Sequence, residues 1–464
     1  MNATLFNKLE IALFTILFLF YGFLCIHFYV ERTTLTDNAF YLFKMVQTES
    51  FNVEHLRYGA VTTQWLVVLL IKIHASLKTI LLAYSLNVYL QYLFIFCIIR
   101  FYLKESLMAW CVIAYMMTTI HYGYFYMACE LVYGGTWICL LLATINSIEK
   151  NNANRKINYV LLLISIMFLF FTHAFLLVIS SLILSFLVIH NFSKLKAIII
   201  GALILVFFIK LKFLTDGYES GKFTDLNKNI FIPQTINQSY FTYFFKQQIN
   251  SVFVFVKVFW IIALVVLAIK QKWKFILSAL LSLLGLYLVI YSLMPNGESL
   301  AYMDSYQSMW YLTGWIFLSY MISFYFEKYK QYYIAVLFLL GLVGLYNINK
   351  GKIYTERIQY YTRIMQDATQ KDCNKIFVNV EQIDMQKVLL TWATPYETLL
   401  LSSLNGQSQT IFINGDVNFD IDKYNQPGKF LGVVWLLDKK TPLNSPYFNL
   451  GNTKYCLWQD IYKN

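Results

Sequence analysis

Acidic side chains are scarce in this sequence, and two of them lie where they could act on a substrate. Of the 464 residues, 58% are hydrophobic and only 25 are Asp or Glu. Asp37 follows the first long apolar segment by a few residues, and Glu130 stands in HYGYFYMACELVYGG, which has no Lys or Arg. Asp37 would face an outer, membrane-adjacent cavity. An ionisable group at the depth of Glu130, at the outer start of an apolar segment, is costly unless it is hydrated or paired, so Glu130 is a candidate for function.

General-base chemistry is what these two carboxylates could perform. One of them would take the proton of an acceptor hydroxyl or amine while a sugar is displaced from its phosphate. A structural interpretation also fits, in which Asp37 caps the helix that follows and Glu130 pairs with a neighbouring donor, because Asp is favoured at helix N-termini. The sequence leaves both interpretations open.

An anionic substrate would need cations near the same membrane face. Residues 31–60, after the first apolar segment, form what we call the first loop. Arg57 lies near the end of this loop, and Lys257 stands inside an apolar segment. An intramembrane Lys lines a polar cavity or meets an anion, or it snorkels to the interface. Tyr41 lies in the first loop. His121 begins HYGYFYMACELVYGG, the segment with Glu130 that we call the second acidic turn. These two residues complete the predicted substrate-binding residues. No metal-ligand spacing is present, and a divalent cation at the carboxylates stays open.

Long apolar segments must position these residues, because they dominate the first 350 residues. They lie near 12–30, 79–99, 107–126, 158–190, 196–214, 251–269, 274–293, 308–325 and 331–348. Most approach the ~20 residues that a helix needs to cross a ~30 Å hydrocarbon core. Their uninterrupted Leu, Ile and Phe runs favour helices over a membrane barrel, whose strands would alternate apolar and polar residues.

Basic residues recur after every second segment and predict the orientation of the chain. They are Lys8, Arg100, Lys104, Lys150, Arg155, Lys156, Lys194, Lys196, Lys270, Lys272, Lys274, Lys328 and Lys330. The positive-inside rule places them in the cytoplasm, with about eleven spans, the N-terminus inside and residues 350–464 outside. The net charge of +12 does not indicate nucleic acid, because these residues are spread over turns.

Residues 61–73 form an apolar segment only about half a span long. If this segment crossed the membrane, every later loop would lie on the side opposite to the one that its charges predict. We therefore expect a re-entrant or interfacial helix on the outer side. Residues 1–350 are therefore predicted to form an all-α polytopic membrane bundle of about eleven transmembrane helices plus this short helix.

Residues 351–464 predict a small extracytoplasmic α/β domain. The segment 353–371 and PYETLLLSSL have helical patterns, whereas KIFVNV, QTIFIN and GVVWLL are typical of strands. No phosphate loop or nucleophile motif is present, so we expect a capping or acceptor-binding role. Cys373 and Cys456 are the only cysteines of this region. Whether they form a disulfide, as an oxidising compartment allows, is left open.

This layout resembles the GT-C glycosyltransferases, polytopic enzymes that take sugars from polyprenyl-phosphate carriers at the outer membrane face. The first outer loop carries Thr36, Asp37 and Asn38 and returns through HLRYGAVTTQWLVVLLIKI, followed by the cytoplasmic turn RFYLKES and the second acidic turn. The similarity covers the whole chain as architecture and residues 31–145 as motif. The sequence departs from the family in having no paired acidic residues at the first site and no Pro-Pro before the short helix, where Gly59 and Ala60 stand.

The resemblance implies a function and its participants. Asp37 would be the base and Glu130 the second acidic position, acting on a polyprenyl-phosphate lipid donor and a glycan, lipid or protein acceptor. The protein would lie in a bacterial inner membrane. Two other classes stay open, namely a transporter or flippase of lipid-linked glycans, with polar residues near mid-membrane, and a non-catalytic membrane assembly protein.

Overall fold

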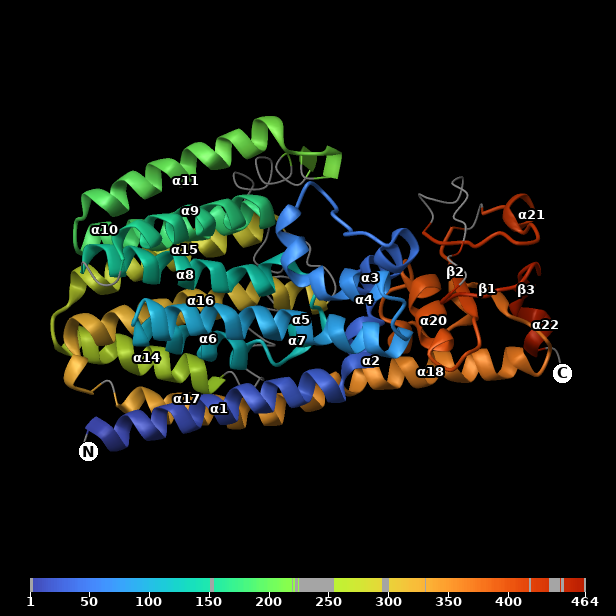
Figure 1. Ribbon diagram of the computed structural model, residues 1–464, viewed down its shortest axis with the longest axis horizontal. Helices are drawn as coiled ribbons and strands as arrows, with labels where there is room; N and C mark the ends of the chain where they lie inside the picture. The colour runs from blue at the N-terminus through green and yellow to red at the C-terminus, as the bar shows by residue number, and fades with distance from the viewer. Residues whose placement is uncertain are drawn as a thin grey trace.

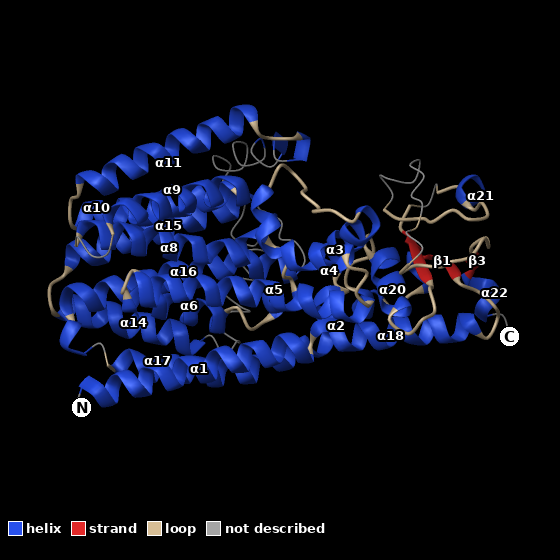
Figure 2. Cartoon of the chain, viewed as in Figure 1, coloured by secondary structure: helices blue, strands red, loops and turns tan. Residues whose placement is uncertain are grey.

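Long apolar helices form most of the chain, as its composition requires. The computed structural model describes residues 3–150, 154–218, 254–293, 300–329, 331–416, 419–433 and 446–462, together with residues 220, 221, 224 and 443. The molecule is elongated, with a helical bundle at one end and a smaller mixed domain at the other (Figure 1; Figure 2). The sequence also predicts an outer loop at residues 215–250, most of which lie outside the described residues.

The bundle is built from helices that are mostly apolar along their whole length. They are α1 (Ala3–His27), α5 (Leu77–Cys97), α6 (Ser106–Thr118), α8 (Glu130–Glu149), α9 (Arg155–Thr172), α10 (Ala174–His190), α11 (Lys194–Phe213), α14 (Val254–Ile269), α15 (Trp273–Leu293), α16 (Leu300–Tyr325) and α17 (Tyr332–Asn347). Among the described residues, six helical segments are long and apolar enough to cross a membrane, and three shorter apolar helices accompany them. These are the features of a multi-pass helical membrane protein, and the eleven crossings stay a prediction.

Ion pairs join neighbouring helices at the end of the bundle that holds the N-terminus. They are Glu10 with Arg100 at 2.7 Å, Glu105 with Lys150 at 2.8 Å and Glu149 with Lys196 at 2.7 Å. Glu10 and Glu105 are buried, so each needs a partner to offset its desolvation. The basic residues that predicted the orientation of the chain therefore also fasten the helices to one another.

The first loop folds into short elements at the opposite end of the bundle. These are α2 (Tyr29–Thr33), α3 (Thr36–Thr48), η1 (Tyr58–Thr63) and α4 (Trp65–Lys72). The eight residues of α4 extend about 12 Å, which is too short for a crossing, as the sequence predicted. A Cβ on Gly59 would overlap the side chain of Thr172 and lie 3.0 Å from its Cα. Glycine therefore lets η1 approach the end of α9.

The C-terminal domain contains a small parallel sheet. Its strands are β1 (Lys375–Asn379), β2 (Thr410–Asn414) and β3 (Cys456–Leu457), in the order β2-β1-β3, and its main helices are α18 (Lys352–Thr369), α20 (Thr394–Ser403) and α22 (Trp458–Tyr462). The predicted strands at KIFVNV and QTIFIN and both predicted helices are confirmed. The predicted strand GVVWLL is not observed at residues 432–433, and residues 434–437 lie outside the described residues.

The division predicted at residue 350 falls inside a nearly continuous helical run. The short turn η5 (Ile348–Gly351) joins α17 directly to α18. One buried apolar cluster also includes residues of the bundle together with Tyr396, Phe430 and Phe448 of the C-terminal domain. The two parts therefore share a core across their junction.

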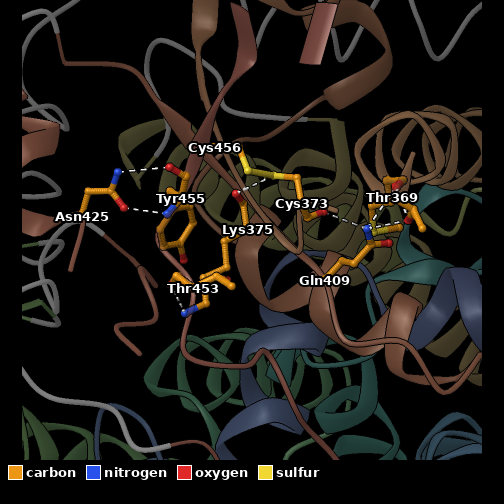
Figure 3. The surroundings of a disulfide bond; sticks show 9 residues. Thr369, Cys373, Lys375, Gln409, Asn425, Thr453, Tyr455 and Cys456 are labelled. Carbon is orange, nitrogen blue, oxygen red and sulfur yellow. Dashed lines mark hydrogen bonds between the residues drawn. A yellow bond between two sulfur atoms is a disulfide. The ribbon is translucent and has the colours of Figure 1, made fainter. Parts of the chain in front are cut away.

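A disulfide bond fastens the end of the chain to the sheet. Cys373 precedes β1 and is bonded to Cys456 of β3, with a Cα–Cα distance of 6.3 Å (Figure 3). The buried Lys375 donates hydrogen bonds to the carbonyls of Thr453, at 3.0 Å, and Lys429, at 3.2 Å. The bond that the sequence left open is present, and it secures a strand only two residues long.

Removing this disulfide should loosen the C-terminal domain. We expect C373A/C456A to lower the free energy of unfolding by about 2–4 kcal/mol, because the bond closes a loop between residues 83 positions apart. Thermal denaturation in detergent measures the loss. As a control, alkylation of the unfolded wild-type protein should modify Cys25, Cys97, Cys111, Cys129 and Cys139 without reductant. Labelling of Cys373 and Cys456 under the same conditions would contradict the assignment.

Candidate functional site

The first loop and the second acidic turn meet at the bundle end that faces the C-terminal domain. Buried Asn38 joins them, since its amide donates to the carbonyls of Arg32 (2.5 Å) and Phe125 (2.7 Å). Its carbonyl oxygen accepts the N–H of Ala128 at 2.7 Å. Asn38 therefore fixes α3 against α7 (Tyr122–Phe125) and the residues that lead to Glu130.

A second buried side chain fastens the same junction. The guanidinium of Arg32 is 1% exposed and donates to Ser85 Oγ (2.9 Å), to the Ser85 carbonyl (3.1 Å) and to the Tyr124 carbonyl (2.8 Å). It also lies 4.0 Å from the centroid of the Tyr124 ring. A buried charge is tolerated only with such partners, so Arg32 holds α2, α5 and α7 together.

Asp37 lies in the first turn of α3, where it accepts a hydrogen bond from the hydroxyl of Tyr126. The N-cap residue of α3 is Leu35, whose side chain makes no capping hydrogen bond. The interpretation of Asp37 as an N-cap is therefore wrong, although a carboxylate in the first turn still interacts favourably with the helix dipole. The contact with Tyr126 instead connects the two acidic segments.

Glu130 begins α8 and pairs with Arg57. The distance between Arg57 Nη1 and Glu130 Oε2 is 3.0 Å, and the two side chains are only 11% and 8% exposed. Glu130 thus has the neighbouring donor that the structural interpretation expected. The same contact also brings a predicted acidic residue and a predicted phosphate ligand into one pair.

Tyr41 lies within electrostatic range of both this pair and Asp37. Burial raises the pKa of the Tyr41 phenol well above its usual value, and the negative charges of Glu130 and Asp37 raise it further, against the opposing effect of Arg57. The phenol therefore stays protonated at neutral pH. We call Asp37, Tyr41, Arg57 and Glu130 the carboxylate cluster, because the charges of the other three residues all affect the pKa of the Tyr41 phenol.

The other two predicted substrate ligands lie in different settings. His121 is buried and precedes α7, in the turn that also provides Tyr126. Lys257 lines an apolar groove of about 630 Å³ between α14, α15 and α16, along with Trp260, Leu264, Phe275, Tyr311 and Met321. Among the described residues that line this groove, none belongs to the carboxylate cluster. The structure thus divides the predicted binding residues between a polar site and a groove.

Basic side chains that were not predicted lie near the end of α9. His173 follows α9, and its Nδ1 accepts the N–H of Phe175 at 3.1 Å. Burial lowers the pKa of His173 well below its usual value, and nearby Arg57 and Lys210 lower it further. The buried Lys210 donates to the carbonyl of Phe170 at 2.6 Å. A lone turn histidine and a helix-end lysine have no distinguishing signal in the sequence.

Comparisons with known proteins identify no relative. No family model, curated protein or solved structure matches this chain. Within the described part of the chain, no group of three His, Cys, Asp or Glu side chains could hold a metal ion. The chemistry of the site is therefore argued from its own geometry.

Acid should destabilise the protein partly through His173. Its folded pKa is lowered, so below about pH 6.5 the unfolded chain binds a proton that the native state excludes, and stability falls. Asn at this position could still cap α10 but cannot titrate. Between about pH 7.5 and about pH 5.5, the melting temperature of H173N should therefore fall less than that of the wild type. Equal falls, measured in one detergent, would refute this.

Proposed function

We propose that the protein is a GT-C-like membrane glycosyltransferase, which transfers a sugar from a polyprenyl-phosphate donor to an extracytoplasmic acceptor. The carboxylate cluster is the observation that carries this proposal. It brings Asp37 from the first loop and Glu130 from the second acidic turn within electrostatic range of the Tyr41 phenol, and Tyr126 of that turn donates a hydrogen bond to Asp37. Scarce carboxylates held near the end of a bundle, beside cations, suit proton removal at an anionic lipid.

Asp37 is the base in this mechanism. The acceptor oxygen or nitrogen attacks the anomeric carbon of the sugar, the bond from that carbon to the phosphate oxygen breaks, and Asp37 receives the acceptor proton. Tyr126 orients the carboxylate of Asp37 through its hydrogen bond. The charge that develops on the departing phosphate is stabilised by cations fixed before the reaction, for which Arg57, held by Glu130, is a candidate.

The groove beside Lys257 supports a lipid donor. Its walls come from three apolar helices, so an isoprenoid chain would bury apolar surface there. Lys257, near the start of α14, supplies a cation for a phosphate at one end of the groove.

The proposed location is a bacterial inner membrane with the N-terminus in the cytoplasm and the C-terminal domain outside. The Cys373–Cys456 bond supports the outer position of that domain, because disulfides persist in oxidising compartments. The candidate charges Asp37, Arg57 and Glu130 lie at one end of the bundle and not near its middle, which favours an enzyme over a transporter.

An assembly protein without catalytic activity is the second candidate. The pairing of Arg57 with Glu130 favours it, because the two charges satisfy each other without a ligand. Under this alternative, Asp37 would only fasten α3 to Tyr126.

Replacing Asp37 separates these candidates. D37N keeps the size and one acceptor oxygen of the side chain but removes the base, so we expect the transfer rate to fall about 10²–10⁴-fold. The variants are expressed in a deletion strain, and mass spectrometry measures its lipid-linked glycans. The strain should accumulate the donor unless the wild-type gene is supplied. E49Q, at the other end of α3, is the matched control and should restore turnover of the donor in this strain. Full complementation by D37N would leave the assembly role as the better account.

Replacing Lys257 tests the lipid groove. K257M keeps the length of the side chain and removes its charge, so the KM for the lipid donor should rise about tenfold with kcat nearly unchanged, as expected for lost ground-state binding. K212M, at the exposed end of α11, is the control and should leave both constants unchanged. An unaltered KM in K257M would exclude Lys257 from donor binding.

A further inference from the structure

The helix that carries Asp37 is held by the C-terminal domain. Figure 1 shows α3 between the bundle and α20. The rings of Phe40 and Phe43 lie 5.2 and 4.8 Å from that of Tyr396 on α20. Phe43 also stacks on Phe430 at 5.5 Å and on Phe448 at 5.6 Å. One face of α3 is therefore buried against residues more than 350 positions later in the chain.

A buried carboxylate anchors the first residue of this helix. Glu397 on α20 is 1% exposed, and its Oε1 accepts the backbone N–H of Thr36 at 2.6 Å. Its Oε2 lies 2.5 Å from Arg357 Nη2 on α18. Arg357 Nη2 also donates to the carbonyl of Leu390 at 3.0 Å. The first amides of a helix need acceptors from outside it, and for Thr36 the C-terminal domain provides one.

Thr36 needs this anchor because its backbone is strained. Its φ of 41° lies in the left-handed region, which β-branched residues rarely adopt. Such a conformation persists only where the surrounding structure imposes it. Since Thr36 directly precedes Asp37, any relaxation of its backbone would move the carboxylate.

We propose that Glu397 is a positioning residue, which holds the strained start of α3 and thereby sets the place of Asp37 relative to Tyr126 and Glu130. This inference rests on the proposed glycosyl transfer. It makes the C-terminal domain part of the frame of the site, beyond the capping or acceptor-binding role expected from sequence. Arg357 orients one oxygen of Glu397 and leaves the other for Thr36.

Two double variants separate positioning from simple stability. R357M/E397Q and R357M/E397L both remove the buried ion pair without leaving a lone charge, which proteins often tolerate. Only Gln keeps an acceptor for the Thr36 amide. We expect R357M/E397Q to keep kcat within about threefold of the wild type and R357M/E397L to lose about 10²-fold, because small misplacements of a catalytic group have effects of that size. The KM for the lipid donor should be similar in the two variants.

Hydrogen exchange tests the anchor without relying on catalysis. Peptides that cover residues 34–43 should exchange about tenfold faster in R357M/E397L than in R357M/E397Q, with bundle peptides unchanged. Equal exchange, or equal kcat, in two folded variants overturns the positioning role while leaving transfer by the wild type intact. A wild-type protein without transfer activity instead overturns the proposed function and the catalytic part of this inference.

Discussion

Charges that leave water in this protein are met by an opposite charge or by hydrogen bonds, and this requirement determines how its segments meet. At the N-terminal end of the bundle, Glu10 and Glu105 are buried against cations from other helices. At the opposite end, Glu130 is paired with Arg57, and in the C-terminal domain the buried Glu397 is paired with Arg357. Loss of one partner would leave a buried charge that is far more costly than the pair.

The same requirement gives the two candidate carboxylates different surroundings. Glu130 faces the guanidinium of Arg57, whereas Asp37 accepts a hydrogen bond from the neutral hydroxyl of Tyr126. Groups of one type take different chemical roles when their environments differ in this way. Within the proposed transferase, Asp37 therefore suits proton transfer, and Glu130 suits holding Arg57 in place.

Helix α3 transmits the arrangement of the C-terminal domain to the candidate site. Its amide at Thr36 is bound by Glu397, its rings pack on Tyr396, and Asn38 fastens it to the second acidic turn. The disulfide and the continuous run from α17 to α18 stiffen the domain on which it rests. A division of the chain at residue 350 therefore does not describe how the site is held.

The sequence by itself determined the elements whose signals are local. Long apolar runs predict helices because backbone amides in lipid must bond within their own segment, and KIFVNV and QTIFIN predict β1 and β2 by composition. Only the tertiary structure decided that Arg57 pairs with Glu130 and that Glu397 supports Thr36. It also decided that Lys257 lines an apolar groove whose described lining includes no residue of the carboxylate cluster. Strand β3, with two residues, carries no periodic pattern and forms because Ile376 and Phe377 pair with it. Such contacts join residues far apart in the chain, and the burial that makes each pairing necessary exists only once the helices have packed.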